Sequence, residues 1–104
     1  KAAAMEKQRL MWEQFCQKYS GKLSAEETRA SREEALQMLE KKDTLPPIRL
    51  KIAKYISDGY TLERNLPKAL EYLEIARDAD PESQAAKKLE PWIDNMRKHI
   101  NQEK

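Results

Sequence analysis

Hydrophobic residues recur every three or four positions along most of the chain, which predicts amphipathic helices rather than strands. The clearest example is a pair of helices between residues 48 and 81. Pro47 can start the first helix, Gly59 can end it, and Asn65 can cap the second. The two apolar stripes are Ile48, Ile52, Tyr55 and Ile56, and then Leu66, Ala69, Leu70, Leu73 and Ala76.

Both helices of this pair have counterparts elsewhere in the chain. A shift of 34 residues superposes Ala35-Leu36 on Ala69-Leu70. A shift of 37 residues superposes Met11, Ile48 and Ala85, then Phe15, Ile52 and Leu89, then Tyr19, Ile56 and Ile93. A helix pair that repeats every 30 to 40 residues is typical of an α-solenoid. We therefore predict one all-α domain over residues 1–104, with repeat 1 over about 2–47, repeat 2 over 48–80 and a closing helix over 81–101.

Residues 48–81 resemble a Sel1-like repeat, the variable-length relative of the tetratricopeptide repeat. The residues that carry the resemblance are Gly59, Asn65, Lys68-Ala69, Tyr72-Leu73 and Ala76. The resemblance implies a short α-solenoid of two helix-turn-helix repeats plus a C-terminal capping helix. It also implies a role in protein binding in a bacterium, in the cytoplasm or the periplasm, with the periplasm favoured.

The first repeat is less regular than the second. Its first helix is expected over residues 2–19, with Met11, Trp12, Phe15, Cys16 and Tyr19 as the buried stripe. Within that stripe Cys16 is expected to be a small buried hydrophobe rather than a reactive thiol. Both 24–27 and 31–34 fit the capping-box pattern, so either the next helix begins early or a short turn precedes it. Residues 22–30 are expected to form an exposed insertion.

The second helix of repeat 1 is expected to end near Lys41-Lys42, whose charges suit a helix C-terminus, and Pro46-Pro47 interrupt the chain after it.

The closing helix contains a proline. One apolar stripe nevertheless continues past Pro91, which favours a kinked but continuous helix. That stripe consists of Ala85, Leu89, Trp92, Ile93, Met96 and Ile100.

Composition and motifs exclude several classes of function. The net charge of +2 is too small for a dedicated nucleic-acid-binding protein. No apolar run approaches the roughly 18 residues of a membrane span, and a single cysteine allows no internal disulfide. His99 is the only histidine and has no zinc ligands at suitable spacing, and Asp78, Asp80 and Glu82 lack the glycine of a calcium loop. No catalytic motif is present, so we predict neither an enzyme nor a metal or cofactor site. Lys1 is not an initiator methionine, so removal of a preceding signal or fusion segment is left open.

A protein partner is therefore the expected ligand. In a solenoid the first helix of each pair lines the concave face, where two pairs of residues correspond: Lys51 with Tyr55, and Lys88 with Trp92. Such a face would anchor an apolar side chain and attract carboxylates. The predicted binding residues are Lys18, Lys51, Tyr55, Asp58, Lys88, Trp92 and Asn95, with Gln14 beside them.

Two alternatives remain open at this point. Tyr55 and Trp92 can instead bury themselves between helices. The expected role is that of a small adaptor, chaperone, inhibitor or immunity-type protein, with self-association also possible. The alternative class is a nucleic-acid accessory protein that uses Lys41-Lys42, Lys87-Lys88 and Arg97-Lys98.

Overall fold

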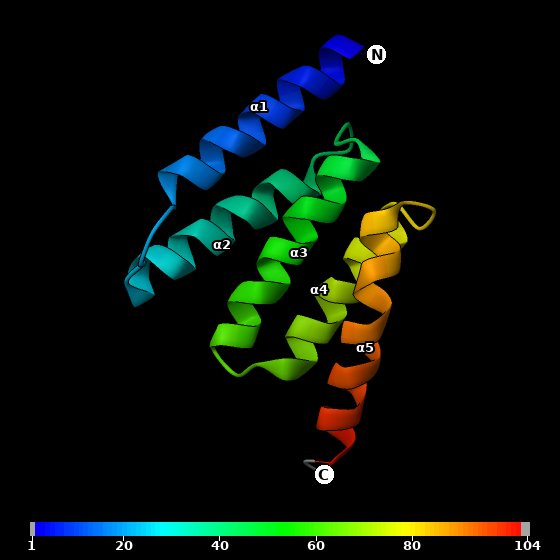
Figure 1. Ribbon diagram of the computed structural model, residues 1–104. Helices are drawn as coiled ribbons and strands as arrows, with labels where there is room; N and C mark the ends of the chain where they lie inside the picture. Colours follow the sequence, from blue (N-terminus) through cyan, green and yellow to red (C-terminus); the bar gives the residue numbers. More distant parts are fainter. Residues whose placement is uncertain (1, 103–104) are drawn as a thin grey trace.

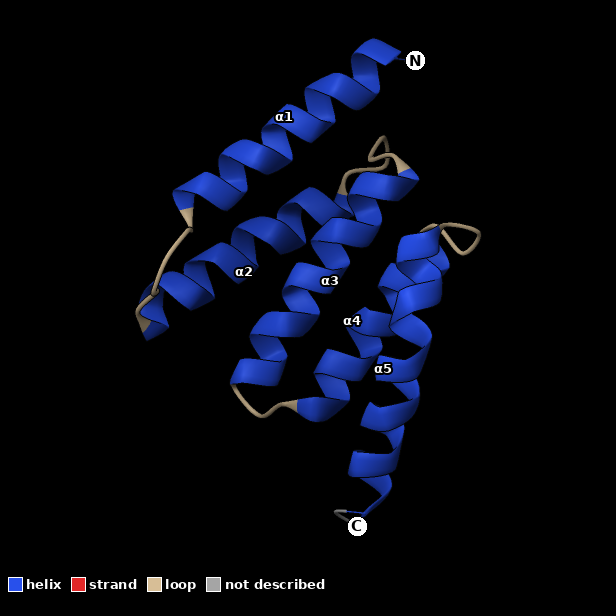
Figure 2. Ribbon diagram, in the orientation of Figure 1, coloured by secondary structure: helices blue, strands red, loops and turns tan. Residues whose placement is uncertain are grey.

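The computed structural model of the protein describes residues 2–102. Five helices and no strand occur within these residues (Figure 2), so the prediction of an all-α chain is confirmed. The helices are α1 (Ala2–Lys18), α2 (Ala25–Glu40), α3 (Pro46–Leu62), α4 (Leu66–Ala79) and α5 (Gln84–Gln102). Over the same residues, no helix combines the length and apolar character that a bilayer-spanning segment needs.

Helix α3 lies at the centre of the molecule, with α2 on one side and α4 on the other (Figure 1). It packs most closely against α4, and α4 in turn packs against α5. Helix α1 lies at the edge of the molecule, and its main contacts are with α3. The backbones of α1 and α2 make almost no close approach, although the two helices are consecutive in the chain.

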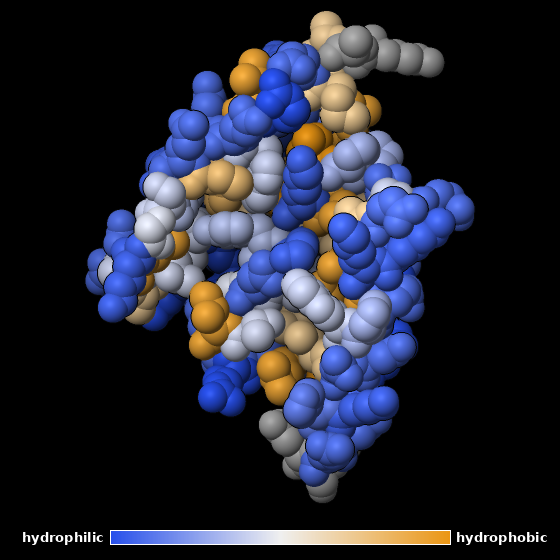
Figure 3. Space-filling view, viewed as in Figure 1, coloured by the Kyte–Doolittle hydropathy of each residue, from blue (hydrophilic) through white to orange (hydrophobic). Residues whose placement is uncertain are grey.

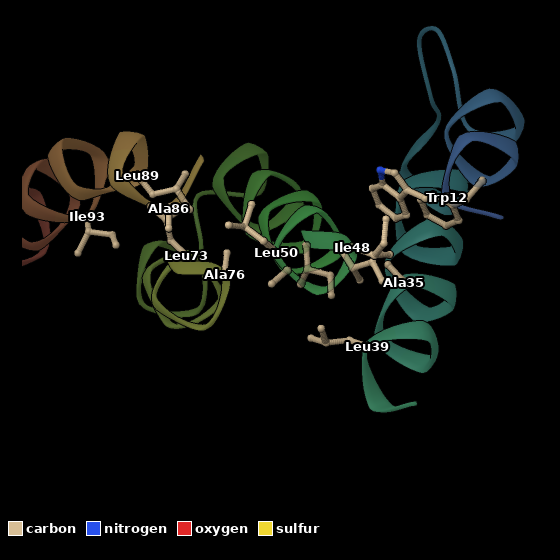
Figure 4. Close-up of a cluster of buried hydrophobic side chains, with 14 residues drawn as sticks. Trp12, Ala35, Leu39, Ile48, Leu50, Leu73, Ala76, Ala86, Leu89 and Ile93 are labelled. Atoms are coloured by element: carbon tan, nitrogen blue, oxygen red, sulfur yellow. The ribbon is translucent and has the colours of Figure 1, made fainter. Parts of the chain in front are cut away.

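One hydrophobic core extends from α1 to α5, and Figure 4 shows its side chains between the helices. Small residues allow α3 and α4 to approach each other, since Ala53, Ala69 and Ala76 are completely buried. The buried Ser57 hydroxyl donates a hydrogen bond of 2.6 Å to the backbone carbonyl of Ala69. The largest fully buried apolar side chains are Ile52, Ile56, Leu73 and Ile93.

Helix α2 begins early, at the first of the two predicted capping boxes. The Ser24 hydroxyl accepts from the Glu27 N–H at 3.1 Å, and the Glu27 carboxylate accepts from the Ser24 N–H at 3.0 Å. The second box, at Ser31, is wrong, because Ser31 is buried inside the helix and donates to the Thr28 carbonyl. Residues 22–30 are mostly exposed, as predicted, but they do not form an insertion, since residues 25–30 are the first turns of α2.

Helix α3 starts at the prolines as predicted but does not end at Gly59. It continues to Leu62, and Arg64 takes the left-handed conformation at φ +64°. The Asn65 N–H donates to the Tyr60 carbonyl at 2.9 Å and the Arg64 N–H to the Thr61 carbonyl at 3.0 Å. These two bonds form a Schellman motif, which satisfies the last carbonyls of the helix without a glycine. Asn65 then caps α4 by accepting from the Lys68 N–H, as predicted.

Helix α5 runs through Pro91 without interruption, which confirms the prediction of one continuous helix. Its start is three residues later than predicted, at Gln84 rather than Pro81. A turn precedes it, in which the Ser83 N–H and hydroxyl both donate to the Asp80 carbonyl. The Ser83 hydroxyl then accepts from the Ala86 N–H at 3.1 Å and so caps the helix.

Four residues predicted to lie in buried stripes are exposed instead: Met11, Cys16, Ala85 and Trp92. Met11 is 38% exposed, and both Cys16 and Ala85 are exposed. In α1 the buried stripe is centred on Trp12 and Phe15, which leaves Met11 and Cys16 on either side of it. In α5 the buried alanine is Ala86, one position after the predicted one.

We expect Arg64→Gly to raise the free energy of unfolding by about 0.5–1 kcal/mol, because glycine adopts the left-handed conformation without the steric penalty of a Cβ atom. Chemical denaturation of the two proteins measures this difference. Arg64→Ala is the matched control, since it removes the same charge but keeps the penalty. If alanine stabilises as much as glycine, the conformation of residue 64 is not the cause.

We also expect Pro91→Ala to stabilise the protein, by about 1–3 kcal/mol, because the alanine N–H can bond the Lys87 carbonyl inside a continuous helix. Thermal melts compare it with Pro67→Ala. Pro67 lies in the first turn of α4, where no N–H is needed, so its replacement should be neutral or slightly destabilising. A destabilised Pro91→Ala protein would contradict the continuous helix.

Candidate interaction surface

The predicted binding residues lie on three helices. Lys18 is on α1, and Lys51, Tyr55 and Asp58 are on α3; Lys88, Trp92 and Asn95 are on α5. The structure brings three of the seven together, because Asp58, Trp92 and Asn95 line one pocket. The other four lie outside this pocket.

The pocket has a volume of about 340 Å³ and lies between the second half of α3, α4 and α5. Leu66, Leu73 and Met96 give it an apolar lining. Its polar lining consists of Ser57, Asp58, Thr61, Asn95 and His99. A mostly apolar cavity with a few polar groups is the common form of a binding site.

Trp92 is the most conspicuous residue of this pocket, because 51% of its surface is exposed. The Lys54 ammonium lies 5.0 Å from the centroid of the indole ring and 3.1 Å from an Asp58 carboxylate oxygen. These contacts link the α5 indole to α3. On the face shown in Figure 3, hydrophobic residues form separate patches among hydrophilic ones. Within residues 2–102, Trp92 is one of four large hydrophobic residues that are exposed, with Leu10, Met11 and Leu62.

Tyr55 lies in a different environment from Trp92. It is half-buried, and its ring meets those of Phe15 and Trp12 edge to face, at centroid distances of 5.1 and 5.8 Å. Edge-to-face pairs of this kind stabilise a packed interface. Tyr55 therefore contributes to the attachment of α1 to α3, and it does not line the pocket at Trp92.

The three predicted lysines also differ from one another. Lys18 pairs with Glu34 at 3.2 Å, and the Tyr19 hydroxyl donates to the same Glu34 oxygen at 2.7 Å. Lys51 and Lys88 are exposed and form no ion pair within residues 2–102. Lys88 lies one helical turn before Trp92, so both are on the same side of α5.

Six residues of the pocket were not predicted from the sequence as binding residues: Ser57, Thr61, Leu66, Leu73, Met96 and His99. For two of them, the helical spacing in the sequence gives an indication. Met96 and His99 follow Trp92 by four and seven positions, which places them on the same side of a helix. Leu66 and Thr61 could not be found this way, because their positions depend on how α3 and α4 pack.

The remaining chemistry of the surface is limited. Within residues 2–102 no three His, Cys, Asp or Glu side chains are grouped so that they could hold a metal ion. Partial desolvation raises the pKa of the Cys16 thiol, which disfavours the reactive thiolate although the residue is exposed.

The chain is not significantly similar to any protein family, curated protein or solved structure with which it was compared. The resemblance to Sel1-like repeats therefore depends only on the residues of the 48–81 segment.

We expect the Tyr19–Glu34 contact to make stability depend on pH. The hydrogen bond from Tyr19, with Lys18 nearby, lowers the pKa of Glu34 below its ordinary value of 4.5. Its stabilising effect is therefore complete above that pH and is lost as pH falls through the lowered pKa of the folded state. The difference in melting temperature between the wild type and Tyr19→Phe should be complete near pH 6 and should shrink as pH falls below 4.5.

Tyr72→Phe is the control for this experiment, because within residues 2–102 the Tyr72 hydroxyl makes no side-chain hydrogen bond. The change in melting temperature that Tyr72→Phe causes should be the same at pH 6 and pH 3, whereas the change that Tyr19→Phe causes should be smaller at pH 3. A constant difference for Tyr19→Phe across this range would contradict a role for the Glu34 carboxylate.

Proposed function

We propose that this chain is a protein-interaction module that binds a segment of another protein at α3 and α5. The observation that carries the proposal is a half-exposed tryptophan at an apolar pocket. Exposed tryptophans next to pockets are frequent hot spots of protein interfaces, because they bury a large rigid surface on binding. The partner segment would insert an apolar side chain beside Trp92.

Charge gives the proposed partner a second property. Lys54 offsets the charge of Asp58 in the pocket, whereas Lys51 and Lys88 remain unpaired within residues 2–102. Carboxylates that flank the apolar anchor would be attracted to these two lysines. The proposed partner is thus a protein segment that combines an apolar anchor with acidic residues.

The proposed fold is a short solenoid of two Sel1-like or tetratricopeptide-like helix pairs, α1–α2 and α3–α4, closed by α5. Two observations support it: α3 packs against both α2 and α4, and α5 packs against α4. The first pair departs from it, because the backbones of α1 and α2 make almost no close approach. The first helices of the pairs and α5 would then line one face. Adaptors, chaperones, inhibitors and immunity-type proteins of bacteria would all fit this arrangement, and self-association through α1 or α5 is compatible with it.

The nucleic-acid alternative has less support. Of its six basic residues, Arg97 already contacts the Glu74 carboxylate and lies near Asp94. Binding through phosphates would weaken steeply as salt rises, whereas binding through an apolar anchor would not.

The proposal can be tested with a partner recovered by pull-down from the native host, whose affinity for the chain is measured by calorimetry. We expect Trp92→Ala to weaken its binding by about 2 kcal/mol or more, as truncation of a hot-spot aromatic does. The melting temperature should change little, because half of the side chain is exposed. Trp12→Ala is the contrasting control, since Trp12 is buried and its loss should cost about 3–5 kcal/mol of stability.

Two outcomes would count against the site. If Trp92→Ala leaves the affinity unchanged, the partner binds elsewhere. If it lowers the melting temperature as much as Trp12→Ala does, Trp92 belongs to the core. Lys88→Glu should mainly slow association, and less so at high salt, whereas the adjacent Lys87→Glu should have a smaller effect because it lies on another side of α5.

A further inference from the structure

A groove separates α1 from α2, although the next two helices in the chain, α3 and α4, pack closely. Two cavities of about 530 and 430 Å³ occupy it. They adjoin each other, because Met11, Met38 and Lys41 line both. This groove is distinct from the pocket at Trp92, which is formed by α3, α4 and α5.

Side-chain contacts fix α1 at both ends of this groove. Near its start, the Gln8 side-chain amide donates to the Asp43 carbonyl and accepts from the Leu45 N–H, both at 2.8 Å. Near its end, Lys18 and Tyr19 bind Glu34 on α2. Between these contacts α1 spans ten residues, or about 15 Å. The groove is therefore already formed in the absence of a ligand, which lowers the entropic cost of filling it.

The apolar surface of the groove is rich in methionine. Met11 on α1 faces the same cavities as Met38 on α2, and Ile48 and Ile52 of α3 contribute beneath them. Methionine side chains are flexible and polarizable, so they adapt to different apolar partners. A single leucine or methionine side chain of a ligand would find contacts on both walls.

Unused polar groups accompany this apolar surface. Gln14 of α1 and Gln37 of α2 line the same cavity, and neither makes a side-chain hydrogen bond within residues 2–102. An extended peptide has free backbone N–H and C=O groups that such amides can satisfy, whereas a helix has already paired its own. A length of about 15 Å accommodates about five extended residues.

Charge selects the class of peptide. Three lysines line the two cavities, Lys7, Lys18 and Lys41, against the two acids Glu34 and Asp43. Glu34 is already engaged by Lys18 and Tyr19, whereas Lys7 and Lys41 form no ion pair within residues 2–102. We infer that the α1–α2 groove binds an extended acidic peptide of about five residues with a central methionine or leucine. This inference does not depend on the proposed function of the Trp92 pocket.

Methyl NMR of the ¹³C-labelled methionines tests the inference directly. The chain has four methionines: Met11 and Met38 in the groove, Met5 outside the two cavities, and Met96 in the Trp92 pocket. The probe is the capped peptide Asp-Glu-Met-Glu-Asp with unlabelled methionine. Its addition should shift the Met11 and Met38 signals and leave those of Met5 and Met96 in place. A ligand of the Trp92 pocket would instead shift the Met96 signal, so the failure of one proposal can be told apart from the failure of the other.

Matched variants and peptides complete the test. Lys41→Glu should weaken the peptide's binding about tenfold, while Lys42→Glu should have a much smaller effect because Lys42 lies outside the two cavities. Replacing the central methionine of the peptide by alanine should remove most of the shift. Equal shifts of all four methionines, no shift at millimolar peptide, or stronger binding of a lysine-containing analogue would each overturn the inference.

Discussion

The close packing of α3 against α4 determines where both surfaces can form. It requires small side chains, and the buried Ala53, Ala69 and Ala76 together with the Ser57–Ala69 hydrogen bond fulfil this requirement. With α4 held against one side of α3, α5 packs on α4 and presents Trp92 toward the end of α3. With α2 on the other side, the aromatic rings of α1 pack against α3, and a groove remains between α1 and α2.

The helices could be predicted from the sequence, but several of their ends could not. Hydrophobic spacing identified all five segments, because a helix with one buried side repeats its apolar residues. The helix ends were ambiguous where a residue type suits both the end and the interior of a helix. Ser31 fits a capping box, yet its small side chain is equally suited to a buried position in α2. Gly59 suggested a stop, but the Schellman motif formed at Arg64, where the glycine preference is not met.

The candidate site was predictable only in part, because exposure depends on which helix covers which. Tyr55 and Trp92 occupy equivalent positions 37 residues apart. The ring of Tyr55 packs against Trp12 and Phe15 from α1, whereas the ring of Trp92 has the Lys54 ammonium over it and stays half-exposed. A repeat pattern specifies which side of a helix a residue is on, but not what lies opposite. The same reason explains Met11, which borders the α1–α2 groove instead of a packed neighbour.

The two surfaces share α3 but use different parts of it. Ile48 and Ile52 line the groove, while Asp58 and Thr61 line the Trp92 pocket, so residues of the two sets are about 9–20 Å apart along the helix. Helix α3 is packed against helices on both sides, so we expect ligands at the two proposed sites to bind without coupling. Binding is nevertheless strengthened when both segments belong to one partner. The second contact then becomes intramolecular. The resulting increase in affinity depends on the length and stiffness of the partner's linker between the two segments, and it needs no change in α3.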